Sequence, residues 1–152
     1  MDASSARLNS THGQRLSDMR NALLNLHKVL VDSERVRYEK VVGAISSPNQ
    51  FLHLVTNDPW FAWLHPISQL IVSMDEAIDG EEPLTPQFVE ALGEQSRALL
   101  VASESGEGFA RHYYDALQED PDVVLAHAAA VKIIGRPAPA KPDRTADNGG
   151  GA

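Results

Sequence analysis

Residues 16–30 read LSDMRNALLNLHKVL, and this stretch decides the class of fold. Its apolar residues recur at alternating spacings of three and four, which places them on one face of an α-helix. The members of this face are Leu16, Met19, Leu23, Leu26 and Leu30. The pattern predicts a helix over residues 14–42 that is ended by Gly43. The opposite side is charged and solvated, and it carries Arg20, Asp32, Arg35 and Glu39.

Four prolines mark further helix starts. Each follows a residue with a good N-cap side chain, in the pairs Ser47-Pro48, Asp58-Pro59, Thr85-Pro86 and Asp120-Pro121. The cap oxygen accepts an unpaired backbone N–H, and proline loses no hydrogen bond at the first helical position because that N–H has no partner within the helix. Together with the apolar periodicity, these pairs predict helices over 14–42, 48–56, 59–79, 86–103, 108–119 and 121–134, the last ended by Gly135.

The predicted fold is all-α, a compact single-domain helical bundle of five to six helices. A chain of 152 residues has the size of one domain, and no alternating β-branched run indicates a strand. The bundle is assigned to residues 13–135. We expect a flexible N-terminus over residues 1–12 and a disordered tail over residues 136–152, because the tail is rich in proline, glycine and polar residues.

Composition excludes several chemistries. The chain has no cysteine, so disulfides, cysteine-ligated zinc, iron–sulfur clusters and thiol nucleophiles are ruled out. No apolar run has signal-peptide length at the N-terminus, and Trp60–Val72 is too short and too polar to cross a bilayer. We therefore expect a cytoplasmic protein that does not bind membranes. Its general character is that of a small bacterial helical protein, and no motif ties it to a characterised family.

Charge is distributed unevenly along the chain. The net charge is −8, yet residues 57–122 carry two basic residues against fourteen acidic ones. Such a run is most often a solvated face that is balanced within the molecule, and it can also attract a basic partner. Because no basic patch is interleaved with aromatic residues, we expect no binding of nucleic acid.

The stretch NDPWFAWLHPISQLI, residues 57–71, holds both tryptophans. Its apolar residues cover more than half of a helix, which indicates a central, buried position. Pro66 follows His65, which is a poor cap, so two structures remain open. Either one helix is kinked at Pro66, or a short turn over 59–64 precedes a new helix that starts there.

In both structures the Ala62 carbonyl, the His65 imidazole and the indole N–H groups would meet in an apolar setting. A bend of this kind is a natural place for a pocket or a partner groove. Aromatic stripes at helical spacing are nevertheless more often ordinary core. Trp60, Trp63 and His65 are therefore candidate binding residues, with ordinary packing as the alternative.

Histidine and carboxylate side chains provide weak candidates for catalysis. His27 lies beside the apolar face of the first helix, and Glu34 follows two turns later on nearly the same face. They form either a catalytic pair that reaches into the bundle or two structural boundary residues. No glutamate is followed by histidine at the spacing of di-iron bundles, and there is no HExxH. We therefore expect no metal and no cofactor.

Residues 109–114, FARHYY, combine aromatic and cationic groups. Phe109, Tyr113 and Leu117 share helical spacing and are expected in the core. Arg111, His112 and Tyr114 then lie nearer the surface, as a small candidate patch for binding a partner or ligand.

The function favoured by these patterns is a non-enzymatic binding or regulatory module. It would dock a protein partner or a small apolar ligand near the kinked tryptophan helix, since every catalytic motif tested is missing. The alternative is a small metal-binding or enzymatic bundle that uses histidine and carboxylate side chains from separate helices. Self-association through the wide apolar helix is compatible with either.

Overall fold

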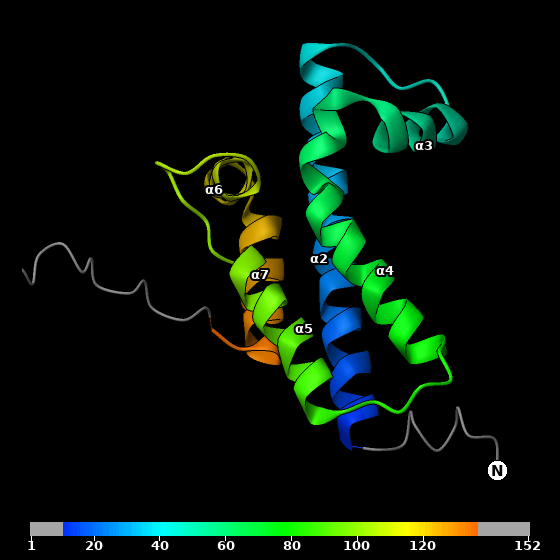
Figure 1. Ribbon diagram of the computed structural model, residues 1–152. Helices are drawn as coiled ribbons and strands as arrows, with labels where there is room; N and C mark the ends of the chain where they lie inside the picture. The colour runs from blue at the N-terminus through cyan, green and yellow to red at the C-terminus, as the bar shows by residue number, and fades with distance from the viewer. Residues whose placement is uncertain (1–10, 137–152) are drawn as a thin grey trace, which may run out of the picture.

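The computed structural model describes residues 11–136 as six α-helices and one short 3₁₀ helix (Figure 1). The elements are α2 (Thr11–Val41), α3 (Pro48–Asn57), η1 (Pro59–Leu64), α4 (His65–Asp79), α5 (Pro86–Leu99), α6 (Phe109–Glu119) and α7 (Pro121–Ile134). No strand occurs in this part of the chain, which confirms the all-α prediction. The predicted flexibility of 1–10 and disorder of 137–152 lie outside the described residues. Thr11 and His12, predicted to be flexible, belong to the first turn of α2.

The predicted helix bounds agree closely with the structure, with two exceptions. The helix predicted over 86–103 ends at Leu99, and the one predicted over 59–79 is divided. Gly43 and Gly135 follow α2 and α7 with positive φ angles of 148° and 110°, a conformation that glycine adopts most readily. None of the helices within residues 11–136 combines the length and the apolar character that a membrane span needs.

All four predicted N-caps form. The side-chain oxygen accepts from a backbone N–H two or three residues later, at 3.1 Å for Ser47 and Gln50, 2.9 Å for Asp58 and Trp60, 3.1 Å for Thr85 and Phe88, and 2.9 Å for Asp120 and Asp122. These local bonds fix where α3, η1, α5 and α7 begin.

Pro66 starts a helix and does not bend one, so the predicted kink is corrected. Residues 59–64 form the 3₁₀ helix η1, and Pro66 lies in the first turn of α4. Its missing N–H therefore costs no helical hydrogen bond. The Ala62 carbonyl accepts from the His65 N–H and is not left unpaired. The second of the two structures considered from the sequence is the correct one.

Helix α2 lies at the centre of the bundle, and not the tryptophan segment as predicted. It contacts η1, α4, α5 and α7, and Figure 1 shows the three α-helices α4, α5 and α7 running along it. The predicted apolar face of α2 is at most 1% exposed at each of its five positions, Leu16, Met19, Leu23, Leu26 and Leu30. Burial of this face against three helices supplies much of the hydrophobic stabilisation.

Helices α2 and α7 run in opposite directions. At the C-terminal end of α7, Arg15 of α2 donates to the carbonyls of Ile133 and Ile134, and Arg97 of α5 also donates to Ile134. These guanidinium groups satisfy carbonyls that lack helical partners and complement the negative end of the helix dipole. α7 is thus fixed beside α2, with its N-terminal end near the C-terminal half of α2.

Candidate functional site

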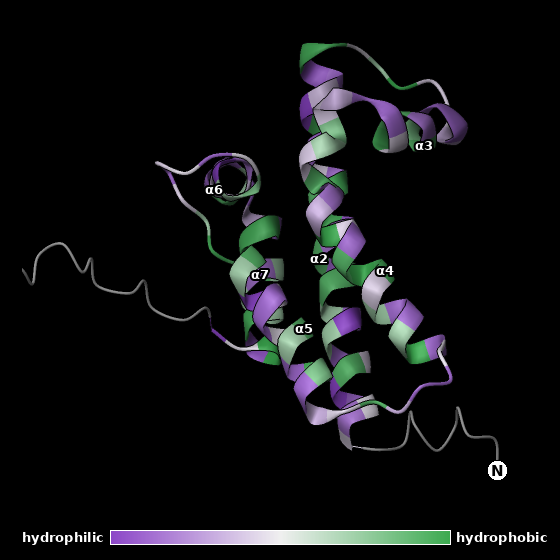
Figure 2. Cartoon of the chain, in the orientation of Figure 1, coloured by the Kyte–Doolittle hydropathy of each residue, from purple (hydrophilic) through white to green (hydrophobic). Residues whose placement is uncertain are grey.

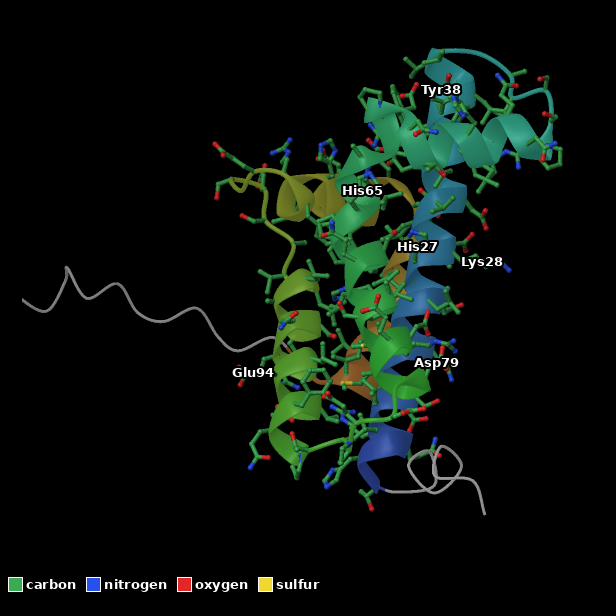
Figure 3. All side chains as sticks on the ribbon, turned by 45° about the vertical axis from the view of Figure 1, so that its right-hand side comes forward. His27, Lys28, Tyr38, His65, Asp79 and Glu94 are labelled. Atoms are coloured by element: carbon green, nitrogen blue, oxygen red, sulfur yellow. The ribbon has the colours of Figure 1, made fainter. Side chains whose placement is uncertain are left out.

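His27 and Glu34 do not form the predicted catalytic pair. His27 is half-buried, and its Nε2 lies 3.0 Å from the Ser68 hydroxyl of α4. Burial lowers the pKa of His27 and favours the neutral ring. Figure 3 shows His27 on α2 and His65 at the start of α4, where His65 is exposed. His27 therefore acts as a contact between two helices.

Glu34 belongs to a different network that the sequence analysis missed. Its side chain is 3% exposed and accepts from Arg37 at 3.0 Å. Arg37 also lies 3.2 Å from the carboxylate of Glu119 at the end of α6. A buried carboxylate needs such a partner because loss of hydration costs several kcal/mol for an unpaired ion. The spacing of three between Glu34 and Arg37 was the available sequence signal.

Trp63 of η1 packs against Phe109 and His112 of α6, and the three side chains form a packed cluster and not an open site. The indole of Trp63 is 9% exposed and contacts the rings of Phe109 and His112 at centroid distances of 5.4 and 5.2 Å. Trp60 is half-buried, with its ring at 5.7 Å from that of Tyr38. Neither buried indole N–H has a hydrogen-bond partner among the described residues.

Arg111 and Tyr114 form a second, smaller group on α6. The guanidinium of Arg111 lies 5.9 Å from the centre of the Tyr114 ring and 3.4 Å from the carboxylate of Asp115. Arg111 also donates to the carbonyl of Glu104. Its charge is therefore already paired within the chain, which reduces what this predicted patch presents to a partner.

A buried tyrosine–histidine contact joins α6 to α7. The Tyr113 hydroxyl lies 2.6 Å from Nδ1 of His127, and the Tyr113 side chain is fully buried. Burial raises the pKa of Tyr113 and lowers that of His127, so both groups are held in their neutral forms. Fourteen positions separate Tyr113 from His127 along the chain, so no local pattern indicates that the two side chains meet.

The groups proposed for metal or acid–base chemistry are dispersed. Within residues 11–136, no three histidine, aspartate or glutamate side chains are arranged to hold a metal ion. His27, Glu34 and His112 each have a different neighbour, in Ser68, Arg37 and Trp63. These three candidate side chains therefore do not meet at one point where they could act together on a substrate.

A groove between α2 and α7 was not predicted. Its volume is about 450 Å³, and its lining residues are Asn25, Val29, Asp32, Ser33, Val36, Asp120, Asp122, Leu125, Ala126 and Ala129. Leu125 and Val36 are 69% and 53% exposed, so the groove has an uncovered apolar surface. The charged residues that line it are all aspartates.

The sequence of α7 explains why this groove is apolar. The helix has the sequence PDVVLAHAAAVKII and is hydrophobic around nearly its whole circumference. In Figure 2, green, the colour of hydrophobic residues, predominates where α7 is visible. Val123, Ala126, Ala130 and Ile134 are buried, while Val124, Leu125 and Ile133 remain 46%, 69% and 42% exposed. A helix that is apolar on all sides is normally covered on all sides. The uniformly apolar composition of residues 121–134 is the sequence signal for this surface.

A second hollow lies beside the connection between α4 and α5. Its volume is about 360 Å³, and it combines Glu76, Glu81 and Glu82 with the apolar residues Leu84 and Phe88. It is built largely by the loop over residues 80–85, whereas two long helices form the walls of the α2–α7 groove. The walls of the groove are thus formed by two packed helices, and we take it as the candidate binding surface.

No protein-family model, curated protein or solved structure matches this chain.

Proposed function

We propose that this protein is a non-enzymatic binding module whose α2–α7 groove docks a helix of a protein partner. The observation that carries the proposal is the exposure of one side of α7, above all of Leu125 at 69%. Exposed apolar side chains on a helix of this composition are stabilised when a second apolar helix covers them. The tryptophan segment favoured by the sequence is a weaker docking surface, because Trp63 is only 9% exposed.

The lining of the groove defines the chemistry of its occupant. Val29, Val36 and Leu125 require apolar side chains, and Ala129 is small enough for a helix to approach closely. Asp32 and Asp122 are exposed and, together with Asp120 at the cap of α7, favour a basic side chain at one end. The occupant is therefore an apolar helix that carries a lysine or arginine. The same carboxylates would repel the phosphates of nucleic acid.

A cytoplasmic location is part of the proposal. Its support is composition alone, since 22% of the residues are charged and no cysteine is present for pairing in an oxidising compartment. Fractionation of the native host, followed by detection of the protein with an antibody, tests the location independently of binding.

Photocrosslinking tests the docking surface. A benzoylphenylalanine replaces Leu125, and a matched control replaces Val72, which is 52% exposed on α4. We expect irradiation in the native host to give an adduct from position 125 that exceeds any from position 72. The adduct should be lost when Asp122→Lys is added, and its crosslinked peptide should carry apolar and basic residues.

Two results would overturn the proposal. One is the same adduct yield at positions 125 and 72, which would mean that no partner covers the groove. The other is an adduct whose crosslinked segment lacks a basic side chain and persists with Asp122→Lys. Circular dichroism of each variant establishes that it is folded before the yields are compared.

A further inference from the structure

The chain itself contains a helix with the chemistry that the groove requires. On α7, Leu125, Ala128, Ala129 and Lys132 follow one another at helical spacings, and all four are exposed. They provide an apolar side chain, two small residues and one basic group. We propose that the occupant of the α2–α7 groove is α7 of a second copy of this chain, packed antiparallel. This inference rests on the proposed function and names its partner.

The alanines allow the two helices to approach closely. Helix axes pack at 8–10 Å, with the shorter distances where the residues at the contact are small. Ala128 and Ala129 lie midway along the exposed side of α7, so the two helices can cross there. Leu125 of one copy then lies opposite Ala129 of the other, where a large side chain fills the space left by a small one.

Charge selects the antiparallel arrangement. Asp32, Asp120 and Asp122 line the α2–α7 groove near the N-terminal end of α7, and Lys132 lies in the last turn of α7. Ten residues separate Asp122 from Lys132, which is about 15 Å along a helix. An antiparallel pair centred near His127 therefore brings Lys132 of each copy to the aspartates of the other. A parallel pair would bring the two sets of aspartates together, and this repulsion disfavours it.

Two-fold symmetry makes the contact self-complementary. Each α7 enters the groove of the other copy, so both exposed apolar surfaces are covered at once and both lysines gain acidic neighbours. His127, near the centre of α7, is already engaged by Tyr113 within its own copy and contributes no charge in its neutral form. The assembly thus has four adjacent helices, α2 and α7 from each copy.

Sedimentation equilibrium of the full chain tests self-association. We expect a concentration-dependent rise from 16.5 kDa toward twice that mass. Leu125→Glu should keep the protein monomeric, because it places a carboxylate on each side of the apolar contact. Val72→Glu, at a side chain 52% exposed on α4, is the matched control and should associate like the wild type.

Charge reversal tests the antiparallel register. Asp122→Lys and Lys132→Glu should each raise the dissociation constant by about tenfold, since each replaces an attraction with a repulsion. The double variant should recover most of the loss because the two reversed groups face each other across the two-fold axis. Circular dichroism checks folding, since both residues also lie near ends of the α7 dipole.

An engineered disulfide provides a test that does not depend on charge. The chain has no cysteine, so Ala128→Cys introduces a single thiol at the expected crossing point. Mild oxidation should convert this variant to a disulfide-linked dimer, whereas Val72→Cys should remain mostly monomeric.

The outcomes separate this inference from the proposed function. A wild type that stays at 16.5 kDa at millimolar concentration, or a double variant no better than either single variant, would overturn the antiparallel dimer. If position 125 then crosslinks to a basic helix of another protein, the proposed function stands and the inference fails. If position 125 crosslinks to nothing, both fail.

Discussion

The imidazole of His112 lies nearly parallel to the indole of Trp63, with 5.2 Å between the ring centroids and 16° between the ring planes. The two residues come from α6 and η1, and His112 is exposed while Trp63 is buried. The stack therefore joins α6 to η1, with the indole buried and the exposed imidazole covering one face of it.

Trp63→Ala is expected to lower the free energy of unfolding by about 3–5 kcal/mol, because it removes a large buried ring that contacts Phe109. His112→Ala is the matched control and should cost less than about 1 kcal/mol, since its ring is exposed. Urea denaturation followed by circular dichroism measures both. Equal losses for the two variants would show that Trp63 does not act as an anchor.

Arg37→Ala is expected to destabilise the protein by about 3–5 kcal/mol, because it removes the charged partner of the buried Glu34 carboxylate. Arg35→Ala removes a half-exposed pair with Glu39 and a cation–π contact with the Phe51 ring, and should cost only about 1 kcal/mol. Adding Glu34→Gln to Arg37→Ala should restore part of the stability, since no charge then remains buried. A double variant as unstable as Arg37→Ala would assign the loss to packing.

Tyr113→Phe is expected to cost about 1–3 kcal/mol, because it deletes the hydroxyl that lies 2.6 Å from Nδ1 of His127 in a buried position. Tyr114→Phe, at a half-buried ring beside Arg111, should change stability by less than about 0.5 kcal/mol. Thermal unfolding of the two variants makes the comparison. No difference between them would mean that the Tyr113 hydroxyl contributes nothing net.

Stability is expected to fall as the pH is lowered from about 7.5 to 5. Burial lowers the pKa of His27 and of His127 below the ordinary value of 6.5, which these groups regain on unfolding. Below pH 6.5 the unfolded chain therefore binds more protons than the folded chain, and the loss continues until the pH has passed through the folded-state pKa values. Above pH 6.5 this contribution to stability is fully present.

The melting temperature across this pH range measures the effect. His27→Gln and His127→Gln should each reduce the difference in melting temperature between pH 7.5 and 5, because each removes one titrating group. His53→Gln, at an exposed histidine of α3, serves as the control for the substitution itself. If all three variants behave alike, the acid sensitivity does not arise from the buried histidines.

Local sequence signals were sufficient for most of the secondary structure. The spacing of Leu16, Met19 and Leu23 predicts the buried face of α2, because a helix repeats every 3.6 residues wherever it packs. The four cap-proline pairs predict where helices begin, since the bond involved spans only two or three residues. Pro66 shows the limit of these signals: its ring is compatible with both a kink and a new helix start, and in the structure η1 ends at Leu64 and Pro66 lies in the first turn of α4.

The candidate site required the fold. His27 and Ser68 are 41 residues apart, and no local sequence pattern predicts that their side chains meet. Of the groove aspartates, Asp32 lies on α2, Asp122 lies on α7 and Asp120 precedes α7, and they share one end because the two helices run antiparallel.

Local sequence patterns are enough to predict that this chain forms helices and where most of them start, and the composition of α7 makes it apolar around nearly its whole circumference. These properties depend on neighbours within about one helical turn. Only the folded structure places α2 at the centre, brings Arg37 of α2 within 3.2 Å of the Glu119 carboxylate of α6, and leaves one side of α7 uncovered. The burial of a side chain depends on which helices surround it, and that arrangement is a property of the whole chain.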